Sequence, residues 1–352
     1  MTIIYFLILL SVVVVIHEAG HLIAAKLFGV YCYEFSIGMG PAVYSKKTDE
    51  TVYSIRALPI GGYVSMAGEE DGDAAYPDVK VPDDRRLKNK KTWQKVIIML
   101  AGVTMNFLLA WVLFSLIILS NGAYSGSPEP LVESVRENSP AEAAGFQAGD
   151  RIIKIEREDG SYVKPETFLD MQTFVSDGKP ETYYVQRGSE EIALTVVPEY
   201  SEEAGTYMIG ITGPSASIHK VNLLNCWYYG FAEMGMIVRL LITTIRSLFY
   251  GSGADQLSGP VGIYQATAAY AAMGLKSFLF LMAEISLNIG IFNLLPLPVL
   301  DGGQIVITLA EAAVHKELNA KVKTVIMLVC WVLLIGLMIF ATWNDIRRLM
   351  GG

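Results

Sequence analysis

Residues 3–27 read IIYFLILLSVVVVIHEAGHLIAAKL, and this stretch decides the class of the protein. It carries no charge before Glu18 and is long enough to cross the apolar core of a bilayer as a helix, which takes about 20 residues. It has neither the basic start nor the small-residue cleavage site of a secretory signal peptide. We therefore expect a transmembrane helix that the protein retains.

The same helix contains the pentad His17-Glu18-Ala19-Gly20-His21. Residues four apart share one face of a helix, so both imidazoles can reach one metal ion with Glu18 beside it. Two histidines buried in an apolar core are the structural alternative. Ionisable groups within a membrane span are costly and usually functional, which favours the metal site.

Composition supports a membrane protein and excludes several other classes. Of the 352 residues 52% are hydrophobic and only 18% are charged, which is unusual for a water-soluble enzyme. The net charge of −8 makes nucleic acid an unsuitable partner. The three cysteines, Cys32, Cys226 and Cys330, are far apart and follow neither a disulfide nor a metal-binding pattern.

Three further stretches have the length and apolar character of spans: residues 96–120, 277–300 and 325–342. A fifth apolar stretch, 223–250, carries Glu233, Arg239 and Arg246, which would be costly at the bilayer centre. We expect it to be an amphipathic helix in the membrane interface.

Basic residues set the expected orientation. The loop between the first two spans is rich in Lys and Arg, whereas acidic residues outnumber basic ones by more than two to one in residues 121–220. The positive-inside rule then places the loop in the cytoplasm and the 121–220 insert outside, with both chain ends outside.

The best candidate for a third metal ligand lies far from the histidines. Residues 288–303 read NIGIFNLLPLPVLDGG, and Asp301 follows two prolines and precedes two glycines, so irregular backbone can present its carboxylate at membrane depth. With four spans Asp301 emerges on the same side as His21. A fifth crossing would separate them.

The insert contains VESVRENSPAEAAGFQAGDRIIKIE (residues 132–156), which resembles a PDZ domain of the bacterial protease type. We expect strands at 131–136 and 151–156, a short helix at 140–144, and a hairpin of 183–187 with 192–197. PDZ domains bind peptide ends by adding a strand to a sheet edge. The alternative is another small β-rich extracellular domain.

With HEAGH in the first span, LPLPVLDGG after a later one and a PDZ-like run between them, the chain resembles the site-2 protease family of intramembrane zinc metalloproteases, and most closely its bacterial RseP-type branch. Further matching segments are FSIGMGP (35–41), ALPIGGYVSMAGE (57–69), AGVTMNF (101–107) and LSGPVGI (257–263). The chain departs from that branch in having one PDZ domain where better-known members have two, and Val103 where proline is common.

The resemblance implies the roles of the site residues. His17, His21 and Asp301 would bind Zn²⁺, and Glu18 would be the general base. Asn293 and Asn288 would hold substrate backbone near the metal. Residues 35–66 would form a membrane-associated β-hairpin, turning at Gly61-Gly62, that clamps the substrate as an added strand.

The function implied is hydrolysis of peptide bonds within or near the transmembrane segment of single-span membrane proteins, such as anti-sigma factors or remnant signal peptides. A site-1-type protease would act first, and the PDZ domain would bind peptide ends. The protein would be a multi-pass protein of the bacterial cell (inner) membrane, embedded in the lipid bilayer, with its active site toward the cytoplasm.

The predicted fold is a polytopic α-helical membrane protein with four transmembrane helices, a membrane-associated β-hairpin region and one extracytoplasmic PDZ (α/β) domain. The expected boundaries are transmembrane helix 1 at 1–27, the cytoplasmic or re-entrant β region at 28–95, helix 2 at 96–120, the PDZ domain at 121–203, a linker with the interfacial helix at 204–276, helix 3 at 277–303, a cytoplasmic loop at 304–324, helix 4 at 325–343 and a tail at 344–352.

Two other functions fit parts of the sequence. A non-catalytic membrane scaffold would use the PDZ domain alone, but it would not require Glu18 and all three proposed ligands. A transporter with metal-coordinating broken helices would explain the third span, but no inverted repeat is visible.

Overall fold

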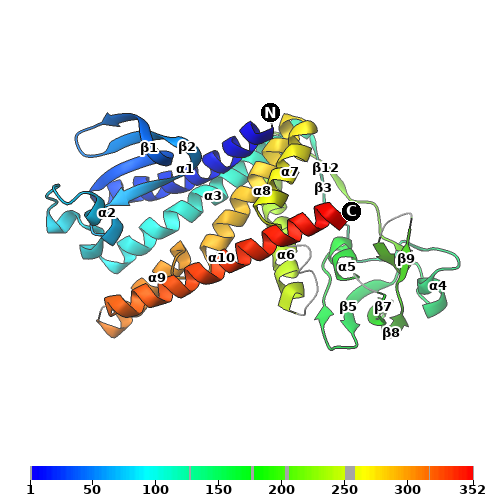
Figure 1. The fold of residues 1–352 in the computed structure, drawn as a ribbon. Coiled ribbons are helices and arrows are strands. Elements are labelled where there is room, and N and C mark those ends of the chain that lie inside the picture. The colour runs from blue at the N-terminus through cyan, green and yellow to red at the C-terminus, as the bar shows by residue number, and fades with distance from the viewer. Residues whose placement is uncertain are drawn as a thin grey trace. The chain divides into compact units, whose positions relative to one another are not determined.

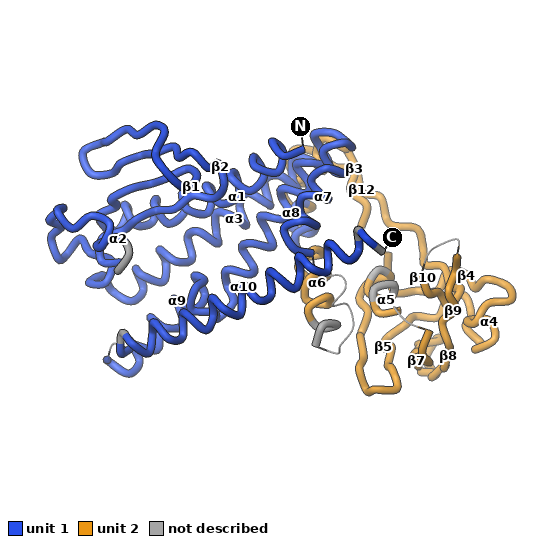
Figure 2. Tube along the Cα trace, in the orientation of Figure 1, with its two compact units in different colours: residues 1–117, 230–234, 255–352 blue, residues 118–229, 235–254 orange. Residues whose placement is uncertain are grey.

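The computed structural model describes residues 2–126, 128–175, 178–202, 206–249, 258–316 and 318–351. The chain divides into two compact units, shown in Figure 2. Unit 1 comprises residues 1–117, 230–234 and 255–352, and unit 2 comprises residues 118–229 and 235–254.

Among the described residues, four helices are long and apolar enough to cross a membrane, which agrees with the number of spans predicted. They are α1 (Thr2–Leu27), α3 (Thr92–Asn121), α8 (Leu275–Asn293) and residues Lys321–Arg348 of α10 (Ala320–Gly351). Helix α6 (Cys226–Phe249), which covers the stretch expected at the interface, is not among these four.

Helices α1 and α3 pack against each other where neither has a side chain. A Cβ added at Gly20 would lie 2.3 Å from the carbonyl oxygen of Ala101 and 2.9 Å from Cα of Gly102. Only glycine allows the two backbones this close approach. Closer to its N-terminus, α1 shares an apolar core with α8, in which Leu9, Val13, Phe278, Leu281 and Met282 are buried.

In the chain segment that connects α1 to α3, strands β1 (Cys32–Lys47) and β2 (Val52–Met66) form an antiparallel hairpin. This sheet lies along the second half of α1 (Figure 1). The first part of β1 is the central strand of this sheet, because Phe35 pairs with Tyr53 on one side and with Val64 on the other. Residues 34–37 pair in parallel with 52–55 and antiparallel with 62–65. The chain therefore reverses direction at residues 48–51 and again between residues 56 and 62, next to the glycine pair expected at a turn. The two glycines lie within β2, where Gly61 has φ +75° and a Cβ at Gly62 would meet the carbonyl oxygen of Ser36 at 2.5 Å.

A buried carboxylate holds the parts of this sheet together. Glu34 on β1 accepts hydrogen bonds from Ser54, from Arg56 at 2.8 and 2.9 Å, from Tyr63 at 3.0 Å and from Tyr76. Burial alone would raise the pKa of Glu34, but these hydrogen bonds outweigh it and lower the pKa. The carboxylate is thus ionised at neutral pH, and β2 is fixed on both sides of β1.

The sheet region carries many exposed apolar side chains. They are Ile37, Met39, Val43, Tyr44, Ile55, Leu58 and Ile60. After β2 come short helical turns, α2 (Glu70–Ala75), η1 (Asp83–Arg85) and η2 (Leu87–Asn89), which complete the region expected at 28–95.

The third span ends earlier than expected and is followed by a separate helix. Helix α8 ends at Asn293, residues 294–300 are irregular, and Asp301 is the first residue of α9 (Asp301–Val314). The expected 277–303 span and 304–324 loop are thus replaced by helix, break and helix. Helix α7 (Pro260–Ala272) was also not expected, and it begins where the carboxylate of Asp345 on α10 accepts the backbone N–H groups of Gly259 and Gly262 at 2.9 and 2.7 Å.

Unit 2 is built on a four-stranded antiparallel sheet with strand order β6-β5-β7-β8. Helix α4 (Pro140–Ala144) coincides with the short helix expected there, and Ser139 caps it. Two-stranded pairings of β3 with β12 and of β4 with β11 extend the unit to residue 220, beyond the expected end at 203. The strands and second helix are β3 (Ala123–Ser125), β4 (Ser134–Val135), β5 (Arg151–Arg157), β6 (Tyr162–Val163), α5 (Phe168–Phe174), β7 (Glu181–Arg187), β8 (Glu190–Val196), β9 (Glu199–Ser201), β10 (Thr206–Met208), β11 (Ile211–Thr212) and β12 (Ile218–Lys220).

We predict that Gly20→Ala destabilises the protein by about 1–3 kcal/mol, because the added methyl group forces α1 and α3 apart. Thermal unfolding of the purified protein in detergent measures the effect. Gly336→Ala on α10 is the matched control, since a Cβ there meets nothing within 4 Å. Equal stability of the two variants would contradict the close crossing.

A second prediction concerns pH and unit 2. Burial would raise the pKa of Asp150, but hydrogen bonds from Arg187 at 2.7 and 2.8 Å lower it from its ordinary value of 3.8. The pair therefore stabilises unit 2 at neutral pH, and this contribution is lost as pH falls through the lowered pKa. Arg187→Leu should destabilise unit 2 by about 3 kcal/mol at pH 7 and by progressively less below pH of about 4.

Amide hydrogen exchange in residues 131–196 of the full chain measures this difference. The control is Arg151→Leu, which breaks an exposed ion pair with Glu129 and should cost less than about 1 kcal/mol. A cost for Arg187→Leu that does not change with pH would rule out the Asp150 carboxylate as its cause.

Candidate metal centre

Three side chains expected to act together meet in unit 1. His17 and His21 lie four residues apart on α1, and Asp301 begins α9. Nε2 of His17 lies 3.1 Å from Nε2 of His21 and 3.1 Å from Oδ2 of Asp301, and Nε2 of His21 lies 3.5 Å from the same oxygen. Both histidines are buried.

The break between α8 and α9 is what brings Asp301 to the histidines. Residues 294–298 fold back against the first turn of α9, so that a Cβ at Gly302 would lie 2.3 Å from the carbonyl oxygen of Leu294 and one at Gly303 would lie 2.0 Å from that of Leu297. The two glycines therefore leave room for the returning chain. Asp301 also lies at a helix N-terminus, where the helix dipole stabilises a carboxylate.

The tautomer of His21 follows from its second nitrogen. Nδ1 of His21 lies 2.8 Å from the carbonyl oxygen of Ile98, which can only accept a hydrogen bond. Nδ1 therefore carries the proton, and in the neutral ring Nε2 presents a lone pair. This lone pair faces the Nε2 atom of His17 and the carboxylate of Asp301, an arrangement of donor atoms that a bound cation would stabilise.

The spacing of these three atoms fits zinc. Tetrahedral Zn²⁺ binds nitrogen and oxygen at about 2.0–2.1 Å, which puts neighbouring ligand atoms about 3.3 Å apart. The observed separations of 3.1, 3.1 and 3.5 Å are close to this value. Within the part of the chain that the structure describes, these residues are the group of His, Cys, Asp and Glu side chains that could hold a metal ion.

Glu18 lies beside the triad and is held by the sheet. Its Oε2 accepts a hydrogen bond from the backbone N–H of Val64 at 3.1 Å. Because this N–H points to α1, it points away from β1, and Val64 lies on the outer edge of β2. The general-base candidate thus lies beside the outer edge of β2, where Glu18 accepts the N–H of Val64 and Glu69 accepts the N–H of Met66.

The two asparagines expected to bind substrate lie on α8. Asn293 is its last residue and is half-buried. The side-chain oxygen of Asn288 is buried and has no hydrogen-bond partner among the described residues. None of the hydrogen bonds that the structure gives for the described residues joins either asparagine to the triad. Their role is therefore still the one that the resemblance implies.

The sequence analysis matched residues 101–107 to the family, but it assigned no role to this part of α3, which supports the histidines. In addition to the carbonyl of Ile98, two residues of α3 lie at the rings. A Cβ at Gly102 would lie 2.4 Å from Nε2 of His21, and the side-chain amide of Asn106 lies 3.3 Å from Nδ1 of His17. Two features of the sequence could have indicated this face of α3: the four-residue spacing of Ile98, Gly102 and Asn106, and the presence of an asparagine in an otherwise apolar span.

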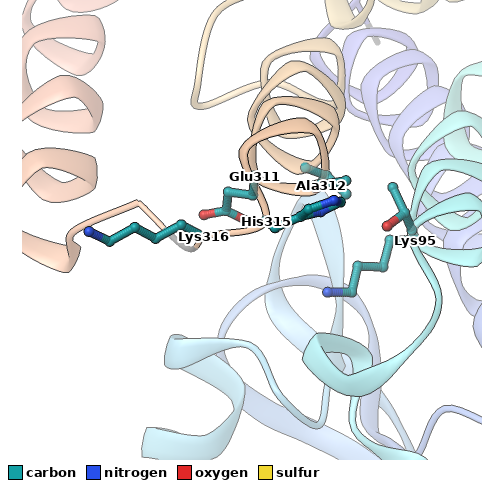
Figure 3. A pocket seen from close by; sticks show the side chains of 7 residues that line it. Lys95, Glu311, Ala312, His315 and Lys316 are labelled. Atoms are coloured by element: carbon teal, nitrogen blue, oxygen red, sulfur yellow. The ribbon is translucent and has the colours of Figure 1, made fainter.

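A surface cavity of about 210 Å³ lies elsewhere in unit 1 (Figure 3). Its lining includes Lys95, Glu311, His315 and Lys316, but Lys316 extends away from Lys95, and no triad residue lines the cavity. The cavity is therefore not part of the metal centre. Its other lining residues are Thr92, Thr308 and Ala312.

Comparisons with known proteins agree with this chemistry. The family model described as peptidase family M50 matches residues 5–337. The chain is 36% identical over 348 residues to a Clostridium perfringens protein whose name marks it as a candidate zinc metalloprotease, covering 98% of each chain. It is 31% identical over 424 aligned positions to the zinc metalloprotease RasP of Bacillus licheniformis, covering 99% of each. Among solved structures, the PDZ domain of an SdrC-like protein from Listeria monocytogenes is 25% identical, with a TM-score of 0.21, covering 26% of this chain and 88% of that one.

We predict that Asp301→Ala lowers the zinc content of the purified protein well below that of the wild type, because it removes one of three ligands. Elemental analysis of the detergent-purified chain measures this. His315→Ala is the control, since it removes a histidine outside the triad. An unchanged zinc content in Asp301→Ala would show that the third ligand is another residue.

Proposed function

The chain belongs to peptidase family M50, and from this premise we propose that it cuts single-span membrane proteins within or near their transmembrane segments. The enzyme is a zinc-dependent peptidase of that family. The observation that carries the proposal is the convergence of His17, His21 and Asp301 next to Glu18, on helices whose length and composition suit a membrane.

The proposed ligands of the zinc ion are His17, His21 and Asp301. When bound, zinc supplies Lewis-acid activation of the attacking water and of the scissile carbonyl. Glu18 is the proposed general base: its carboxylate accepts a proton from the attacking water and passes it to the leaving amine. The hydrogen bond from Val64 fixes one carboxylate oxygen and leaves the other oxygen to face the reaction.

The sheet next to the triad supports a substrate bound as an extended strand. A peptide in a helix has its carbonyl groups in hydrogen bonds, so it must unwind before hydrolysis. We propose that unwound backbone pairs with the outer edge of β2, as in other cases of strand addition. Because the N–H of Val64 is already bonded to Glu18, this pairing uses the carbonyl group of Val64. A strand paired at Val64 passes beside Glu18, and Asn288 and Asn293 are proposed to hold the same backbone from α8.

The remaining proposals concern the surroundings of the enzyme. We propose that the loop containing β1 and β2 lies in the cytoplasm of a bacterial cell, because it is rich in basic residues, and that unit 2 lies outside. Unit 2 is proposed to be a PDZ domain that binds peptide ends exposed by a preceding site-1-type protease. Anti-sigma factors and remnant signal peptides are the proposed substrates. A scaffold without activity is disfavoured because Glu18 and the complete triad lie together.

We predict that Glu18→Gln retains zinc but reduces cleavage by at least about 10²-fold, because the amide has the same shape and cannot accept the proton. The assay measures cleavage of single-span segments of varied sequence, fused to a reporter and reconstituted with the enzyme in vesicles. Wild-type enzyme treated with a chelator, and then given zinc, is the control for metal dependence. Normal turnover by Glu18→Gln would exclude Glu18 as the base.

A further inference from the structure

One face of α3 is in contact with both proposed histidine ligands. Ile98, Gly102 and Asn106 are spaced four residues apart, so they follow one another along the same side of the helix. The carbonyl oxygen of Ile98 accepts the Nδ1–H of His21, and Gly102 leaves room for both rings. The side chain of Asn106 reaches the remaining imidazole nitrogen, Nδ1 of His17, at 3.3 Å.

Asn106 has a buried polar atom without a partner. The residue is fully buried, its Nδ2 is the atom that faces Nδ1 of His17, and its Oδ1 has no hydrogen-bond partner in the part of the chain that the structure describes. A buried carbonyl oxygen of this kind normally accepts a hydrogen bond. The partner has to come from a nearby donor.

The donor follows from the chemistry of His17. Its Nε2 faces Nε2 of His21 and Oδ2 of Asp301, so a metal bound by these atoms takes the lone pair of Nε2. The proton of the neutral ring then lies on Nδ1, which becomes a hydrogen-bond donor. In the observed orientation of the carboxamide, two donors would then face each other: Nδ2 of Asn106 and Nδ1–H of His17. A half turn of the carboxamide exchanges its nitrogen and oxygen and pairs Oδ1 with Nδ1–H.

We propose that Asn106 is a positioning residue, whose side-chain oxygen accepts the Nδ1–H of His17 and thereby fixes the tautomer and the ring orientation that direct Nε2 to zinc. The inference rests on the zinc site proposed above and goes beyond it. With the carbonyl oxygen of Ile98 at His21, α3 then supplies an acceptor to each histidine ligand. Such outer partners raise the basicity of the ligand and strengthen metal binding.

The backbone of Asn106 is itself held in place from α8. The hydroxyl of Ser286 donates to the carbonyl oxygen of Asn106 at 3.0 Å, and Ser286 is fully buried. A Cβ at Gly290, one turn later, would lie 2.6 Å from the ring of Phe107. Helix α8 therefore fixes the position from which the amide reaches His17, independently of the amide group.

The test compares two variants of the same size that differ in hydrogen bonding. Asn106→Asp keeps an acceptor in place, whereas Asn106→Leu has neither donor nor acceptor. The dissociation constant for zinc is measured by competition with a chelator on the full chain in detergent. We expect Asn106→Leu to weaken zinc binding about 10–100-fold and Asn106→Asp to stay close to the wild type. Ser115→Ala removes another buried hydrogen bond on α3, to the carbonyl oxygen of Trp111, and should not change zinc affinity.

Each other outcome overturns the inference. Zinc affinity of Asn106→Leu equal to that of the wild type would show that His17 needs no such acceptor, while loss of zinc in His17→Ala would leave the metal site standing. If Asn106→Asp bound zinc as weakly as Asn106→Leu, the amide of Asn106 would act as a donor instead. Zinc retained in full by His17→Ala would refute both the site and the inference. Asn106→Ala, which adds no volume, replaces Asn106→Leu if the latter does not fold.

Discussion

The close approach of α1 and α3 is the constraint on which the metal centre depends. Gly20 lets the backbone of α3 contact α1, and Gly102 leaves the space that the two imidazole rings fill. With any side chain at Gly102, Nε2 of His21 would be displaced. The HExxH pattern places two histidines on one face of a helix, but the direction in which the rings point is decided by the neighbouring helix. The orientation of the rings is therefore set by helix packing and does not require a bound metal.

Asp301, the proposed third ligand, is brought to the histidines by a break in the chain. A continuous helix from α8 would carry Asp301 about 12 Å beyond Asn293. The irregular residues 294–300 return the chain instead, and Gly302 and Gly303 allow it to pack on the first turn of α9. Irregular backbone at membrane depth is tolerated only where protein or a wet cavity surrounds it. The break and the triad therefore depend on each other, and the hydrogen bond from Val64 on β2 fixes Glu18 beside the triad.

How much the sequence predicts depends on how local each feature is. The four spans follow from length and apolar composition, the histidine pair follows from helix periodicity, and Asp301 was found because a carboxylate after two prolines has few structural explanations. The pairing of residues 34–37 on both sides was not expected, because the partner of a strand is set by tertiary pairing. Helix α9 was missed because the glycines that mark its start resemble a loop. The contact of Asn106 with His17 depends on how two helices cross, which spacing along one helix does not reveal.

Zinc K-edge X-ray absorption of the purified protein tests the central claim, that the crossing of α1 and α3 and the break before α9 create one zinc site. The account predicts a first shell of nitrogen and oxygen at about 2.0–2.1 Å that contains two imidazoles. It also predicts that one imidazole disappears from the spectrum of His17→Ala. A sulfur neighbour at about 2.3 Å, or a spectrum that His17→Ala leaves unchanged, would contradict it.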